Sequence, residues 1–376
     1  MTGNLISAII LKIGLLLCLF LLVFGLLTSC VNQKFDSEKI IGVKIYEYSG
    51  DITTLFVEWT QLGINTVFVS PSLDSIPSFR EEALKHQIKR FLIIPTFFDP
   101  NALKNNPELY AITDRGKPAK EEWVEFVCPN KTEYRQKKIA YIENLIKDLD
   151  PDGISIDFIR YFAFWEKIYP DRSPLSLSNT CFDKTCLDKF QNDIGIKIPK
   201  SVHGSEEIAA WILKNYGDEW TNWKCHTITS MVKEIADVAR MVKPSIKINL
   251  HAVPWRSNDY NGAIKTVIGQ NLVDLGSYVD FISPMCYHHM LKRETSWIHD
   301  VITDFFEQTH NQILPSIQVS KAYLQNDLTV EEFEGAIKQS LKIPSAGVVF
   351  WNWDAIAASP AKKAIIHRYF KGNIEI

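Results

Sequence analysis

Hydrophobic positions from residue 40 onward follow two patterns in turn. Short apolar runs typical of buried strands are followed by segments in which apolar residues recur every three or four positions, as on one face of a helix. The strand-like runs are residues 41–46, 66–70, 91–96, 153–158, 246–251, 278–284, 312–319 and 346–351. The helical pattern is clearest at 134–149 and recurs at roughly 53–62, 78–86, 220–242, 262–275, 296–309, 330–341 and 360–369.

Eight strand–helix repeats predict an α/β fold, a (β/α)8 barrel that occupies residues 40–376 as one domain. An open, doubly wound sheet is the alternative. No Gly-rich dinucleotide turn follows the first strand, which favours the barrel. Residues 99–132 after strand three and 162–219 after strand four are too long to be simple connections. We expect these two insertions to shape a pocket at the carboxyl end of the barrel.

Alternation within the fourth run divides its residues between two faces. Ile154 and Ile156 lie on an apolar face that we expect to pack on the helices, whereas Ser155 and Asp157 should point into the barrel. Asp157 is near the carboxyl end of its strand, where barrel enzymes hold their catalytic groups. Asp152 is about 16 Å away along an extended strand and is interpreted as a turn residue. The structural alternative for Asp157 is an ion pair within the barrel.

The other predicted strand ends also carry polar or aromatic side chains. Such groups can hydrogen-bond to or stack on a polyhydroxylated ligand, so we predict a carbohydrate substrate at this rim. The candidate binding residues are Arg160, Tyr161, Trp165, Asp99, His251, Trp255, Tyr287, His288, Gln318, Trp351 and Trp353. Arg160 and Tyr161 could also act by orienting Asp157, and Arg160 could be purely structural.

Residues 152–161, DGISIDFIRY, resemble the D-G-[IV]-x-[LF]-D-[FY]-x-R-[YF] signature of the glycosyl-hydrolase-like barrel families, the "family 10-like" group and its relatives. Residues 127–130 with Tyr134-Arg135, SPMCY at 283–287 and GVVFW at 347–351 are similar to the same families. The resemblance covers about residues 40–360, and it implies a (β/α)8 glycosidase with a functional acid at Asp157. Family members often carry a proline soon after the Arg-aromatic pair, whereas Phe162-Ala163-Phe164-Trp165 follows here.

Hydrolysis of a glycoside normally needs two carboxyl groups, about 5–5.5 Å apart for retention of configuration and about 6.5–9.5 Å for inversion. Asp157 is the first, as nucleophile or base. The candidates for its partner at other strand ends are Asp354, Glu47 and Asp99. Asp354 ranks first, because burial by the neighbouring tryptophans would raise its pKa. Glu166, in the second insertion, is a further candidate.

Two other functions fit the same residues. A metal-dependent hydrolase or deacetylase would use His251, His288, His289 and Asp157, but their spacing matches no zinc motif. A non-catalytic surface barrel that binds glycans would lack the acid pair. The net charge of -3 gives no reason to expect nucleic acid as a partner. We predict no cofactor and no metal site.

The amino terminus carries an export signal. Residues 13–27 are nearly all apolar and are followed by Leu27-Thr28-Ser29-Cys30, which resembles the lipobox of bacterial lipoproteins. We therefore predict a signal peptide at 1–30, a lipid (palmitate-type) anchor on Cys30 and a polar tether at 31–39. Val31-Asn32 carries no acidic retention signal, which favours the outer membrane. An uncleaved anchor helix is the alternative, and both place residues 31–376 outside the cytoplasm.

Five of the seven cysteines follow the signal: Cys128, Cys181, Cys186, Cys225 and Cys286. Export permits disulfides, but an odd number leaves at least one free thiol. Cys181 and Cys186 are close enough in sequence to bridge. We favour a local disulfide, or two thiols in a loop, because a metal site would need two further ligands that the spacing does not supply.

Overall fold

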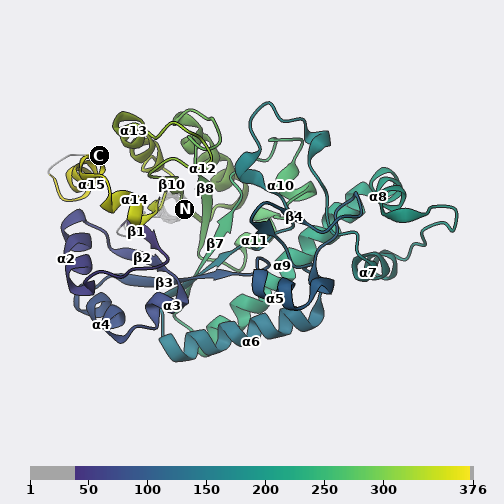
Figure 1. Ribbon diagram of the computed structural model, residues 1–376, viewed down its shortest axis with the longest axis horizontal. Helices are drawn as coiled ribbons and strands as arrows, with labels where there is room; N and C mark the ends of the chain where they lie inside the picture. Colours follow the sequence, from purple (N-terminus) through teal and green to yellow (C-terminus); the bar gives the residue numbers. More distant parts are fainter. Residues whose placement is uncertain (1–38, 373–376) are drawn as a thin grey trace, which may run out of the picture. The chain divides into compact units, whose positions relative to one another are not determined.

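The computed structural model describes residues 39–372 (Figure 1). The predicted signal peptide, Cys30 and tether residues 31–38 lie outside the described residues. The barrel belongs to a compact unit that starts at Ile40. Within the described part of the chain, every helix is too short or too polar to cross a bilayer.

Parallel strands close into an eight-membered barrel, which confirms the predicted fold. The strands are β1 (Ile40–Ile45), β2 (Thr66–Val69), β3 (Lys89–Pro95), β6 (Gly153–Asp157), β7 (Lys247–Ala252), β8 (Phe281–Cys286), β9 (Gln312–Ile313) with β10 (Ser316–Gln318), and β11 (Gly347–Trp351). β1 pairs with β2 and β11, and β10 pairs with β8 and β11, so the sheet has no open edge. The predicted seventh strand is divided at Pro315, which has no N–H to donate to a neighbouring strand.

Helices surround the barrel (Figure 1). Those that match the predicted periodicity are α2 (Ile52–Leu62), α4 (Pro77–Lys85), α6 (Thr132–Leu149), α9 (Gly217–Val242), α12 (Ser296–Thr309), α13 (Val330–Ser340) and α15 (Pro360–Phe370). The prediction of one helix at 262–275 is wrong. This segment forms two short helices, α10 (Ala263–Thr266) and α11 (Leu272–Gly276). Gly269 between them adopts a left-handed φ of 76°, and a helix cannot continue through that conformation.

The barrel interior changes from apolar to polar along its axis. Phe68, Phe91 and Phe281 pack against one another at the amino end. Gly153 faces this layer, since a Cβ there would lie 2.4 Å from the Phe91 ring. One step further along β6, Ser155 accepts a hydrogen bond from Asn249 of β7 at 2.8 Å. The small and polar face of the fourth strand therefore points inward as predicted, and Asp157 follows Ser155 toward the carboxyl end.

Two insertions and two short helices stand above the carboxyl ends of the strands. The first insertion holds α5 (Pro100–Asn105), η1 (Pro107–Leu109) and a small hairpin of β4 (Lys120–Glu121) with β5 (Val124–Glu125). The second holds η2 (Trp165–Lys167), η3 (Pro174–Ser176), α7 (Lys184–Ile194) and α8 (Gly204–Asn215). The short helices are α3 (Pro71–Asp74) and α14 (Trp353–Ala357). Phe190 of α7 packs edge-on against Trp220 and Trp223 of α9, which anchors the second insertion.

Candidate active site

Asp157 contacts a backbone amide and a histidine at the end of β6. Its Oδ1 accepts the backbone N–H of Phe158 at 2.7 Å, and its Oδ2 lies 3.0 Å from Nδ1 of His251 on the adjacent strand β7. Burial alone would raise the pKa of Asp157. His251, the ammonium group of Lys44 and the Phe158 amide outweigh burial and hold that pKa well below its usual range. Asp157 is therefore ionised throughout the physiological range.

Hydrogen bonds inside the barrel determine which ring nitrogen of His251 carries the proton. Asn249 donates to Ser155 Oγ at 2.8 Å, which leaves the Ser155 hydroxyl proton to point at His251 Nε2, 3.3 Å away. His251 Nε2 is then the acceptor and Nδ1 carries the proton that faces Asp157. Burial and the nearby charge of Lys44 lower the pKa of His251, although Asp157 opposes this, so the ring is neutral when it donates to Asp157.

Lys44 is a buried cation that the sequence analysis missed. It points inward from β1, is only 1% exposed, and donates from Nζ to the hydroxyl of Tyr287 at 3.2 Å. Burial lowers the pKa of Lys44 to about 8, against the opposing effect of Asp157. The same alternation that placed Asp157 would have found it, since Lys44 lies between the outward-facing Val43 and Ile45.

Glu166 is a second buried acid, and its surroundings raise its pKa, whereas those of Asp157 lower it. It lies in the short turn η2, is 8% exposed, and its Oε2 has no hydrogen-bond partner among the described residues. Burial raises the pKa of Glu166 to about 7. The Arg160 guanidinium opposes the rise and the negative charge of Asp157 adds to it. Near neutral pH, Glu166 therefore keeps a proton that Asp157 has lost.

Arg160 is a buried cation that follows β6. The charges of Glu166 and Asp157 act on it, while burial lowers its pKa to about 10. Its guanidinium donates to the carbonyl oxygens of Tyr161 and Ala163 at 3.2 and 2.9 Å. These bonds tie Arg160 to the backbone at the start of the second insertion, which corresponds to the structural role among its alternatives.

Three aromatic side chains pack together near the two acids. Tyr287 stacks on Trp351 with ring centroids 4.4 Å apart, and Trp165 packs against the same tyrosine at 6.0 Å. Burial raises the pKa of Tyr287 well above its usual value, and the charges of Asp157 and Glu166 contribute to the rise. Three of the predicted binding residues, one each from η2, the end of β8 and the end of β11, therefore meet beside the acids.

A second group of aromatic side chains comes from the two insertions and the loop after β10. The Trp123 indole donates to the Tyr323 hydroxyl at 2.7 Å, and the Phe164 ring lies edge-on to both, at 6.0 and 5.5 Å. Burial raises the pKa of Tyr323 to about 12, and the charge of Glu166 contributes. Tyr323 comes from the loop after β10, which has no periodicity from which its position could be predicted.

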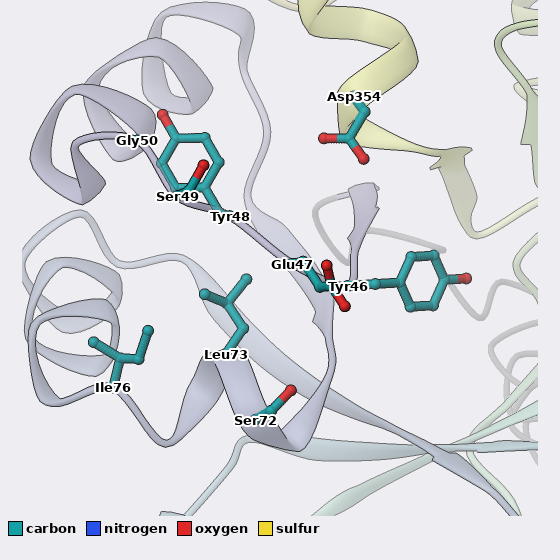
Figure 2. Close-up of a pocket in the computed structure, with 9 residues that line it drawn as sticks. All are labelled: Tyr46, Glu47, Tyr48, Ser49, Gly50, Ser72, Leu73, Ile76 and Asp354. Carbon is teal, nitrogen blue, oxygen red and sulfur yellow. The ribbon is translucent and has the colours of Figure 1, made fainter.

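Glu47 and Asp354 line a neighbouring pocket of about 650 Å³ (Figure 2). Both residues are exposed. The predicted burial of Asp354 is therefore wrong, and with it the reason to rank Asp354 first as the partner of Asp157. Asp157 is not part of this pocket. Tyr46 joins the two regions: the residue is 37% exposed and lines the pocket, while burial of its phenol group and the charge of Asp157 raise its pKa.

Tyr161 and Asp99 lie away from the two acids. Tyr161 is fully buried, accepts a hydrogen bond from Asn130 at 3.3 Å and lies under the Lys224 ammonium group. Asp99 caps the amino end of α5 through the amide of Ala102 and accepts from Tyr134 at 3.0 Å. Each side chain is satisfied by its own surroundings, so neither prediction of sugar binding gains support.

Four more predicted binding residues make structural contacts. Trp353 is buried against Trp59, and Trp255 against Tyr260. The Gln318 amide accepts from the Met290 N–H at 3.0 Å and donates to the Ser320 carbonyl at 2.7 Å. His288 Nε2 lies 3.2 Å from Glu332 of α13, on the outside of the barrel. His289 contacts the same glutamate, so the three histidines of the metal-hydrolase alternative do not converge on Asp157.

The fold of the chain is similar to that of several solved glycoside hydrolases. The PgaB (BpsB) glycoside hydrolase domain from Bordetella bronchiseptica aligns over 88% of this chain and 98% of its own, at a TM-score of 0.67 and 12% identity. A β-galactosidase from Marinomonas ef1 aligns over 89% and 59% (0.64, 10%), and a β-amylase catalytic domain from Paenibacillus polymyxa over 89% and 98% (0.57, 11%). No protein-family model and no curated protein sequence matches. The fold is therefore a (β/α)8 barrel of the kind found in glycoside hydrolases.

Proposed function

We propose that the protein is a glycoside hydrolase whose catalytic carboxyl groups are Asp157 and Glu166. The observation that carries the proposal is the opposite protonation of two buried acids at one rim, with Asp157 ionised and the pKa of Glu166 raised to about 7. Two carboxyl groups with separated pKa values are what acid/base cleavage of a glycosidic bond requires. The glycosidase-type fold of the neighbours supports the same class.

Each acid has one role in this reaction. Glu166 donates its proton to the glycosidic oxygen as the bond to the anomeric carbon breaks. Asp157 either attacks that carbon, or removes a proton from the water that does so. His251 and the Phe158 amide each occupy one position on the Asp157 carboxylate, and lone pairs remain on both oxygens for this step. The exposed part of Trp351, stacked on Tyr287, offers a face for a sugar ring.

The first test is hydrolysis of a panel of glycans and aryl glycosides by the full chain in mild detergent. Asp157→Asn should lower kcat/KM at least 10³-fold, because the ionised group acts directly in the reaction. Asp354→Asn is the matched control and should change it less than about threefold, since that carboxylate lies in the neighbouring pocket. Product anomers from the same reactions distinguish retention from inversion.

The competing function is a barrel that binds glycans without cleaving them. Binding to the same panel is therefore measured for wild type and Asp157→Asn. Equal binding by both proteins, with no turnover by wild type on any substrate, would rule out the glycosidase proposal in favour of the binding barrel.

We also propose that Cys30 carries a lipid anchor that holds the barrel at the bacterial envelope, as Leu27-Thr28-Ser29-Cys30 indicates. Mass spectrometry of the mature protein should find an acylated Cys30 as the first residue, and Cys30→Ala should abolish palmitate labelling. A mature chain that retains residues 1–29 would instead identify an uncleaved anchor.

A further inference from the structure

Three thiols and a carboxylate form a buried cluster outside the candidate active site. One ligand atom each from Cys128, Cys181, Asp183 and Cys186 lies within 4.8 Å of all the others. The sulfur atoms of Cys128 and Cys186 are 3.3 Å apart, and none of these cysteines forms a disulfide. The predicted disulfide between Cys181 and Cys186 is therefore absent, and the alternative prediction of two free thiols holds. Cys128 and Asp183 are the two further ligands that the sequence spacing did not reveal.

We propose that this cluster is a structural zinc site with three cysteine ligands and one aspartate. Tetrahedral zinc with Zn–S bonds of about 2.3 Å holds its sulfur ligands about 3.8 Å apart. That spacing lies between the 3.3 Å of the Cys128–Cys186 pair and the 4.8 Å limit of the cluster, so small side-chain shifts suffice. A disulfide needs an S–S distance of about 2.05 Å and would leave a third thiol and a carboxylate unused.

The surroundings of the cluster supply what metal-bound thiolates require. The Ile112 backbone N–H donates to Cys181 Sγ at 3.2 Å, and Asn130 Nδ2 donates to Cys186 Sγ at 3.2 Å. Lys131 Nζ lies 2.8 Å from Asp183 Oδ2. Zn²⁺ with three thiolates and one carboxylate carries a charge of about -2, which amide donors and an ammonium group compensate. The two amides and Lys131 would thus orient the zinc ligands and offset the negative charge of the site.

The chain around the cluster is arranged to present the ligands. Asp183 caps α7 by accepting the Cys186 N–H on Oδ1 at 2.6 Å, so the helix start fixes both residues together. Cys128 comes from the end of the first insertion, just before α6. An ion here would therefore join the two insertions. Soft sulfur ligands in a closed, buried, four-ligand set favour zinc over magnesium or calcium.

Metal content of the full chain is the direct test. The protein is purified in detergent with a non-thiol reductant, supplied with zinc, desalted and analysed by inductively coupled plasma mass spectrometry. Wild type and Cys286→Ala, which removes a buried thiol from β8, should both hold about one zinc per chain. Cys181→Ser should lose at least nine-tenths of it.

Two measurements keep the proposal testable if Cys181→Ser does not fold. Cobalt added to metal-free wild type should give the thiolate-to-metal charge-transfer absorption and the intense visible bands of a tetrahedral site. Asp183→Asn retains a capping side chain but loses the charged ligand. It should therefore still bind zinc, with roughly 10–100-fold lower affinity in chelator competition.

Two results would overturn the site. One is a folded wild-type chain that holds less than a tenth of an equivalent of zinc and gives no tetrahedral cobalt spectrum. The other is a Cys128–Cys186 disulfide in peptides mapped without reduction from the mature protein. Both readouts are independent of hydrolysis, so failure of the zinc site and failure of the glycosidase proposal are distinguishable.

Discussion

Asp157 ends a strand of the barrel, whereas Glu166 lies in a short turn of an insertion, and their surroundings give them opposite protonation. The strand places Asp157 beside a histidine, a backbone amide and the ammonium group of Lys44. The insertion buries Glu166 and leaves one of its oxygens without a partner among the described residues. Burial acts on both groups in the same direction. The comparison shows that donors and charges, and not depth, decide which acid is ionised.

After the loss expected for Asp157→Asn, the largest effect should come from removing the proton of Glu166. Glu166→Gln should lower kcat/KM about 10³-fold for natural glycans and alkyl glycosides, because their leaving groups need protonation. Dinitrophenyl glycosides leave without a proton, so the loss on them should be below tenfold. Wild-type kcat/KM on the natural substrates should also fall as pH rises through about 7, where Glu166 ionises. An equal loss on both substrate classes would contradict its role as the acid.

The second effect is on stability. Because folding raises the pKa of Glu166 from 4.5 to about 7, the folded chain binds more protons than the unfolded chain between these values, and stability falls as pH rises through that window. Glu166→Gln should therefore be more stable than wild type at pH 8, by on the order of 3 kcal/mol at most. Below pH 4 the carboxyl is neutral in both states and the difference should vanish. Urea unfolding at both pH values checks the sign.

The contact between His251 Nδ1 and Asp157 Oδ2, 3.0 Å apart, gives the third effect. His251→Leu removes the donor and should lower kcat/KM by about 10–100-fold, as loss of a hydrogen bond to a charged group costs roughly 1.5–3 kcal/mol. It should also move the acidic limb of the pH profile to higher pH, because Asp157 becomes easier to protonate. His251→Asn restores an N–H donor of similar reach and should recover part of the activity. Identical profiles for the two variants would mean that His251 is only a packing residue.

The smallest effect concerns the aromatic face beside the acids. Trp351→Leu removes the partner of Tyr287 and should raise KM about fivefold with little change in kcat, in line with roughly 1 kcal/mol for an aromatic contact. Trp353→Leu, buried against Trp59 in the outer core, is the control that should reduce thermal stability and leave KM unchanged. A KM shift in the control alone would reverse this assignment.

The two acids also mark how far sequence reasoning reaches. The two-residue period of a strand correctly predicted that Asp157 points inward. The same period applies to Lys44, which was not recognised from the sequence. The turn that carries Glu166 has no period, so the sequence analysis could only name it as one candidate in the insertion. Asp354 was ranked above it on the tryptophans beside it. The structure shows that Trp353 packs toward Trp59 and leaves Asp354 exposed, since adjacent helical residues point to different faces.

Distance along the chain limited the rest. The four residues of the proposed zinc site come from two insertions, and Cys128 is separated from the others by a complete helix and strand. A pattern within one segment cannot reveal such a set. The eight strands were predictable because each carries its own signal.

The aromatic layer formed by Phe68, Phe91 and Phe281 fills the amino end of the barrel with apolar side chains. Asp157 lies at the opposite, carboxyl end of β6, beyond the hydrogen-bonded pair of Ser155 and Asn249. If the proposed function holds, a sugar would reach Asp157 from the carboxyl end only, and its hydroxyl groups would have to replace the water that it displaces from the carboxylate.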